Sequence, residues 1–74
     1  MFDFRFIYSE GKDYTVENVN KIGLHTTGGY TEIASDHILT APLSLTTMSL
    51  FTSTGNVTVS GKDLVAIEVT EQKS

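Results

Sequence analysis

Residues 55–64 read GNVTVSGKDL, and this stretch contains the unit from which the chain is built. Gly55 can adopt the positive φ that a tight hairpin turn requires. Val57 and Val59 alternate with polar residues, which is typical of a short strand with one buried face. The polar run 60–63 predicts a bend, and we expect the apolar Leu64 that follows it to plug the core.

The same unit occurs earlier in the chain. Residues 26–38 match residues 52–64 without a gap. The shared features are a turn glycine, a β-branched residue in the short strand and an apolar anchor. They pair as Gly29 with Gly55, Ile33 with Val59, and Ile38 with Leu64.

A third copy begins at Gly11 and matches with a one-residue deletion, which places Val19 at the anchor position. The tripeptide GKD occurs at 11–13 and again at 61–63, but it falls in the turn of one unit and in the bend of the other. A shared ligand site would need a shared geometry. We therefore interpret the repeat as a structural device and not as a binding motif.

The N-terminal segment carries the clearest strand pattern. Residues 2–9 alternate aromatic with other side chains, and this period of two predicts a strand whose aromatic face is buried. The aromatic positions are Phe2, Phe4, Phe6 and Tyr8. Further strands are expected around 14–19, 20–27, 30–34, 46–53, 57–60 and 65–70.

The fold class that follows is all-β. We expect a small antiparallel meander of five to seven short strands that forms a curved sheet or a partly open barrel, SH3-like or Sm-like in general shape. Residues 35–44 are the one helix candidate, and Pro42 limits it to about one turn. Residues 1–74 form one domain, with 71–74 as a frayed tail.

Composition narrows the function classes. The formal net charge is -4, and the five Lys and Arg residues are scattered, which disfavours phosphate binding. The chain has no cysteine, so disulfides and thiolate metal sites are excluded. We expect a cytoplasmic protein without a cofactor. Small acidic domains of this kind are common in bacteria and phages.

Two functional hypotheses rest on a few residues each. Asp36 and His37 are adjacent and could serve a metal-dependent enzyme, but a capping role for Asp36 and a solvated His37 are the favoured interpretation, so catalysis is not expected. A single-stranded nucleic acid could stack on exposed aromatics beside basic residues. The candidates for that surface are Lys12, Tyr14, Lys21 and Tyr30.

Self-association is the hypothesis that the pattern favours. Ile7, Phe51 and Leu64 are expected on the face opposite the main apolar residues of their strands, where a single sheet leaves them uncovered. Edge strands also pair readily between chains. The alternative is a closed barrel that covers both sets internally. The sequence thus predicts a homo-oligomeric structural or accessory protein, with its partner and its oligomer size open.

Overall fold

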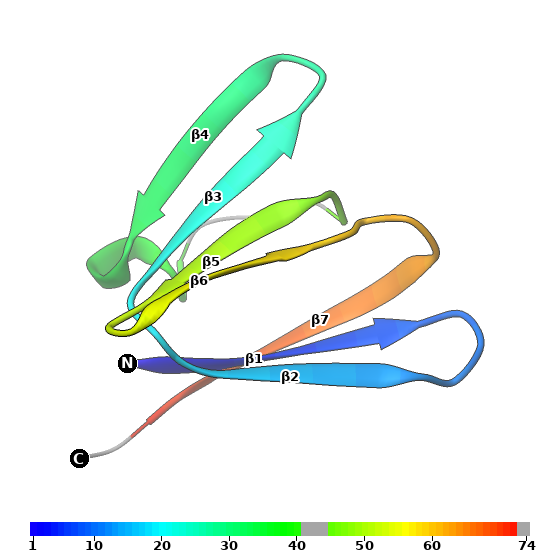
Figure 1. The fold of residues 1–74 in the computed structure, drawn as a ribbon, viewed down its shortest axis with the longest axis horizontal. Helices are drawn as coiled ribbons and strands as arrows, with labels where there is room; N and C mark the ends of the chain where they lie inside the picture. The colour runs from blue at the N-terminus through cyan, green and yellow to red at the C-terminus, as the bar shows by residue number, and fades with distance from the viewer. Residues whose placement is uncertain (41–44, 73–74) are drawn as a thin grey trace.

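The computed structural model describes residues 1–40 and 45–72. This part of the chain is all-β and forms two antiparallel sheets (Figure 1). One sheet has three strands in the order β2-β1-β7, and the other has four in the order β4-β3-β5-β6. The strands are β1 (Phe2–Tyr8), β2 (Asp13–Val19), β3 (Lys21–Thr26), β4 (Gly29–Ala34), β5 (Met48–Thr52), β6 (Gly55–Val59) and β7 (Leu64–Glu71).

The two sheets are joined where the chain passes from β2 to β3. A single residue, Asn20, separates these strands, and its backbone N–H donates to the carbonyl of Phe51 at 2.9 Å. The chain therefore changes sheets at a sharp bend, as at the corners of packed β-sheets. In the described residues the two sheets do not close into a barrel, so the open form of the expected architecture is confirmed and the closed-barrel alternative is wrong.

The core lies between the facing surfaces of the two sheets. The aromatic alternation of β1 is confirmed, because Phe4 and Phe6 are fully buried, with ring centroids 6.1 Å apart. The four-stranded sheet contributes side chains from alternate positions of β3, β5 and β6. These are Ile22, Leu24, Met48, Leu50 and Val59.

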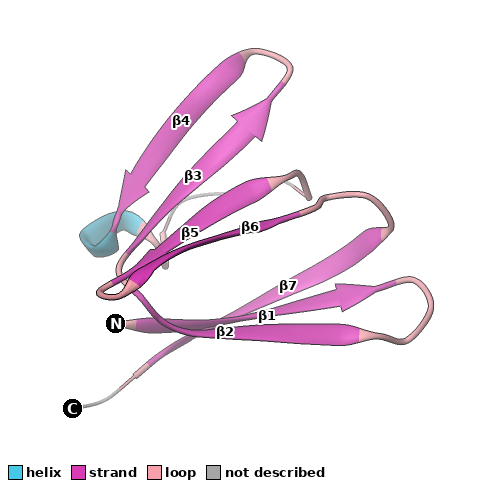
Figure 2. Cartoon of the chain, viewed as in Figure 1, coloured by secondary structure: helices cyan, strands magenta, loops and turns pink. Residues whose placement is uncertain are grey.

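Each copy of the repeat corresponds to a hairpin and a buried anchor in the structure. The hairpins are β1–β2, β3–β4 and β5–β6 (Figure 2). The anchors Val19, Ile38 and Leu64 are 0%, 1% and 7% exposed, so their expected position in the core is confirmed. Val19 is the last residue of β2, Ile38 follows the turn Ser35–His37, and Leu64 is the first residue of β7.

The structure differs from the expectations for two segments, the helix candidate at 35–44 and the C-terminal tail at 71–74. The helix candidate is reduced to a 3-10 turn, Ser35–His37, and residues 41–44, with Pro42, lie outside the described residues. The tail does not fray at 71, because β7 includes Glu71 and the N–H of Gln72 donates to the Met1 carbonyl at 2.9 Å; residues 73–74 lie outside the described residues. In residues 1–40 and 45–72 no helix has the length and apolar character needed to cross a membrane.

Candidate self-association surface

The three residues expected on a second apolar face do not form one surface. Leu64 belongs to the core, so its assignment to the outer face is wrong. Ile7 and Phe51 are half-buried on the outer faces of different sheets. The Lys21 ammonium lies 4.7 Å from the Phe51 ring centroid and covers part of it. These residues therefore do not provide an apolar surface for self-association, and the sheet edges are the remaining candidates.

The position of Leu64 has a clear physical cause. Simple alternation along residues 64–69 puts Leu64 opposite Ile67. In the structure the register of β1 with β7 shifts between Ile7 and Tyr8, so that Ile7 pairs with Ala66 and Tyr8 pairs with Leu64. The extra residue in this β-bulge is Val65, which is 52% exposed. A bulge resets the alternation, and Leu64 turns inward.

Four strands are edges within the described residues. They are β2 and β7 in the three-stranded sheet, and β4 and β6 in the four-stranded sheet. An edge strand directs half of its backbone N–H and C=O groups away from its sheet, where a strand of another chain can pair with them. Which groups these are follows from the hydrogen bonds of the inner strands.

The outward groups of β6 can be identified from its neighbours. The N–H of His25 donates to the Thr47 carbonyl at 3.0 Å, so odd-numbered residues near β5 face β3. The alternating ladder then directs Met48, Leu50 and Thr52 toward β6. Their partners there are Val59, Val57 and Gly55. The backbone groups of Asn56 and Thr58 therefore point outward, and both residues are exposed.

The edges differ in charge. Three of them carry carboxylates: Asp13 and Glu17 on β2, Glu32 on β4, and Glu68 and Glu71 on β7. The sequence of β6 is GNVTV and contains no charged residue. Charged side chains on an edge strand oppose pairing with a second chain. By this criterion β6 is the edge best suited to pairing.

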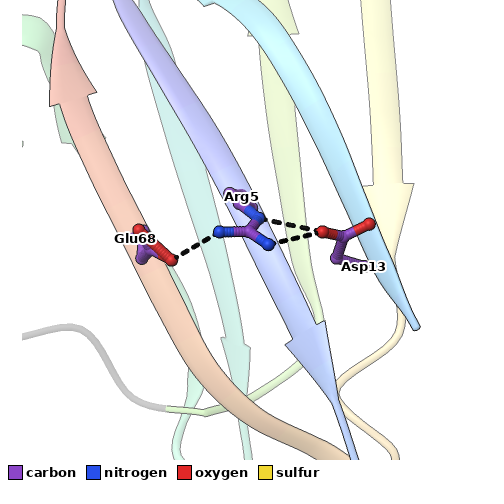
Figure 3. A network of polar contacts seen from close by, with 3 residues as sticks. All are labelled: Arg5, Asp13 and Glu68. Atoms are coloured by element: carbon purple, nitrogen blue, oxygen red, sulfur yellow. Dashed lines mark hydrogen bonds and ion pairs between the residues drawn. The ribbon is translucent and has the colours of Figure 1, made fainter. Parts of the chain in front are cut away.

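The outer face of the three-stranded sheet is held by an ion-pair network centred on β1 (Figure 3). Arg5 donates to the Asp13 carboxylate from Nε at 2.9 Å and from Nη2 at 2.7 Å, and to Glu68 from Nη1 at 3.0 Å. The hydrogen bond to Asp13, and then the negative charges of Asp13 and Glu68, raise the pKa of Arg5 above its ordinary value. The network links all three strands on the side away from the core.

The outer face of the four-stranded sheet is organised around a tyrosine and a glycine. The Tyr30 ring lies over Gly23, where a Cβ atom would fall 2.6 Å from Cε1 of the ring. The phenol donates to Glu32 at 3.0 Å, and the ring centroid lies 4.8 Å from that of His25. Loss of hydration against the sheet, followed by the hydrogen bond to Glu32 and its charge, raises the pKa of Tyr30.

The candidates for a nucleic-acid surface are divided between the two sheets. Lys21 and Tyr30 share the outer face of the four-stranded sheet, but Glu32 lies between them and also pairs with Lys21 at 3.5 Å. Lys12 is near the tip of the first hairpin, 3.8 Å from Glu10. Tyr14 pairs with Phe6 in the other sheet and is 49% exposed. The four candidates therefore do not form one surface, because Lys12 and Tyr14 belong to the β1–β2 hairpin and Lys21 and Tyr30 to the four-stranded sheet.

Asp36 and His37 lie in the 3-10 turn. Their side chains approach to 3.7 Å, and both are largely exposed. His25 is on β3, where its Nε2 makes a hydrogen bond with the Ser49 hydroxyl at 3.0 Å. Among the described residues no group of three or more histidine and acidic side chains could hold a metal ion. Within residues 1–40 and 45–72 the surface also has no pocket.

Sequence reasoning did not identify Asn56 and Thr58 as exposed residues of an edge strand. The absence of charge in residues 55–59 can be read directly from the sequence. The edge position of this strand cannot be read in the same way, because it depends on strand order.

Comparison of the chain with protein-family models, with curated proteins and with solved structures finds no match in any of the three.

Proposed function

We propose that this chain is a small structural or accessory protein that acts by associating with copies of itself through its sheet edges. The observation that supports this proposal most is the open architecture. In the described part of the chain, residues 1–40 and 45–72, two separate sheets leave four edge strands with backbone groups directed outward. Pairing these edges between chains would satisfy those groups and extend the small core.

The size of the chain adds a thermodynamic reason. A domain of about 60 to 80 residues buries a smaller share of its surface than a larger domain does, so its stability is marginal. Without cysteine, disulfides cannot supplement the core. Any contact that binds the folded state and not the unfolded chain adds to stability by mass action. Self-association supplies such a contact.

The test is the native mass of the chain after nuclease treatment, measured by light scattering on a sizing column. We expect a mass that rises with protein concentration from 8.1 kDa toward a multiple of it. The thermal midpoint should also rise with protein concentration, because association is linked to folding. A mass of 8.1 kDa at every concentration, with a constant midpoint, would contradict the proposal.

A second candidate function is the binding of single-stranded nucleic acid on the outer face of the four-stranded sheet. The observation that favours it is the shared placement of Lys21 and Tyr30 on the outer face of this sheet. Binding of a fluorescent mixed single strand should weaken steeply as salt is raised, if lysines neutralise phosphates there. No binding at about 50 mM salt rejects this candidate.

A further inference from the structure

We infer that the self-association surface is the β6 edge, and that two copies of the chain pair through it about a two-fold axis at Val57. This inference rests on the proposed function and deepens it, because it names the strand, the register and the partner. The two four-stranded sheets would join into one continuous sheet of eight strands.

The register follows from the outward groups. Asn56 and Thr58 direct their backbone N–H and C=O groups away from β5. An antiparallel pair satisfies both residues when Asn56 of one copy faces Thr58 of the other, and the two-fold axis then passes through Val57. About four backbone hydrogen bonds form across this junction. The two-fold axis makes the interface isologous, so that each copy contributes the same strand.

The side chains fit this register. Val57 points to the core side and is half-buried in the single chain, so it would meet its own copy across the axis on the apolar face. Asn56 and Thr58 lie on the outer face, where their polar side chains would be direct neighbours. Cross-strand pairs of these kinds stabilise sheets.

Charge decides between the edges. Pairing two copies through β2 or β7 would bring four carboxylates into the joint, and pairing through β4 would bring two. Pairing through β6 brings none. The whole chain carries a net charge of -4, so two copies repel each other. This repulsion is weakest when they pair through β6, because that strand carries no carboxylate.

The short length of β6 limits the affinity of the dimer. Five residues form a short junction, well below the area of a standard stable interface. We therefore expect a dimer that dissociates on dilution and not a permanent one. Its population should be followed by sedimentation velocity over a wide range of protein concentration.

The decisive experiment exchanges charges across the axis. The variant Asn56→Lys/Thr58→Lys places lysine against lysine in the dimer, and Asn56→Glu/Thr58→Glu places glutamate against glutamate. Each variant alone should have a dissociation constant at least about tenfold higher than the parent chain. An equimolar mixture should form a heterodimer, because each introduced lysine then faces an introduced glutamate and the two attract.

A backbone variant tests the hydrogen bonds. Thr58→Pro removes an outward N–H and leaves the ladder to β5 intact, so dimerisation should weaken while the circular dichroism spectrum is retained. The matched control is Thr15→Pro. Thr15 lies on the edge strand β2. The N–H of Tyr8 donates to the Lys12 carbonyl, so the backbone groups of Lys12, Tyr14 and Val16 face β1. Those of Thr15 therefore point outward. The control should dimerise as the parent does.

The outcomes separate the inference from the proposed function. A parent chain that is monomeric at all concentrations overturns both. A parent chain that associates, together with charge variants that associate equally well, overturns the β6 inference and leaves self-association through another edge. Loss of the dimer in each charge variant with recovery in the mixture establishes the β6 junction, whether or not the proline variant folds.

Discussion

Asn18 and Asp63 share a left-handed backbone conformation, with φ angles of 62° and 64°, and each directly precedes a buried anchor of the core. The two residues occupy equivalent places in the first and third copies of the repeat. Asn and Asp adopt this conformation more readily than other residues that carry a Cβ atom. The polar bend of the repeat therefore has a specific role: it turns the chain so that Val19 and Leu64 point inward.

Replacement of either residue by valine should destabilise the fold. A β-branched side chain in the left-handed region costs about 1–2 kcal/mol, and Asn18→Val and Asp63→Val should each lower the free energy of unfolding by that amount. Asn18→Gly should have a smaller effect, because glycine accepts this φ without strain. Urea denaturation followed by circular dichroism measures the change. Thr15→Val, at an exposed strand position, is the control, and an equal loss there would contradict the argument.

The buried face of β1 should carry a large share of the stability. Phe4 is fully buried against Phe6, and Phe4→Ala should lower the free energy of unfolding by about 3–5 kcal/mol, or prevent folding. The matched control is Val65→Ala on an exposed bulge residue, with an expected change within about 0.5 kcal/mol. Similar losses at both positions would show that the inward face of the sheet is wrongly assigned.

The ion-pair network around Arg5 should stabilise the fold by attraction between charges and not by burial of side chains. Arg5→Gln leaves the carboxylates of Asp13 and Glu68 without their shared cation, so the urea midpoint should fall slightly. The loss should be much smaller than for Phe4→Ala, because all three side chains are exposed to solvent and screened. Addition of about 1 M NaCl should reduce the difference between variant and parent. A difference that does not respond to salt would contradict an electrostatic role.

Local patterns in the sequence predict much of this fold. The alternation of β1 identifies its buried face, the repeated glycines identify the hairpins, and the anchor positions place Val19 and Ile38 in the core. These features depend on residues that are close in sequence. Period-two alternation and turn chemistry act at that range, so they can be read without knowing which strands pair.

The candidate site depends on contacts that are distant in sequence. Arg5 and Glu68 lie 63 positions apart, and only the pairing of β1 with β7 brings them together. The same pairing contains the bulge that turns Leu64 inward and Val65 outward. Strand order also decides which strands are edges, and so makes Asn56 and Thr58 a candidate surface. No local pattern specifies these pairings.

The contact of Tyr30 with Gly23 should couple the two positions energetically. An alanine at position 23 would push its Cβ into the Tyr30 ring, so Gly23→Ala should destabilise the chain by about 1 kcal/mol. In a Tyr30→Thr background the same substitution should cost less, because the ring is gone. A double-mutant cycle measured by urea denaturation reports this coupling. Additive effects would mean that the ring does not cover the glycine.

The same tyrosine makes stability depend on alkaline pH. Loss of hydration and the hydrogen bond to Glu32 raise the folded-state pKa of Tyr30 above its ordinary value of 10.0. The stability that this contact contributes is therefore present below about pH 10 and is lost as the pH rises through the raised pKa. Comparison of parent and Tyr30→Phe by titration of tyrosine absorbance isolates this group. Glu32→Gln should bring its pKa down toward 10.0, while Glu17→Gln should leave it where it is in the parent.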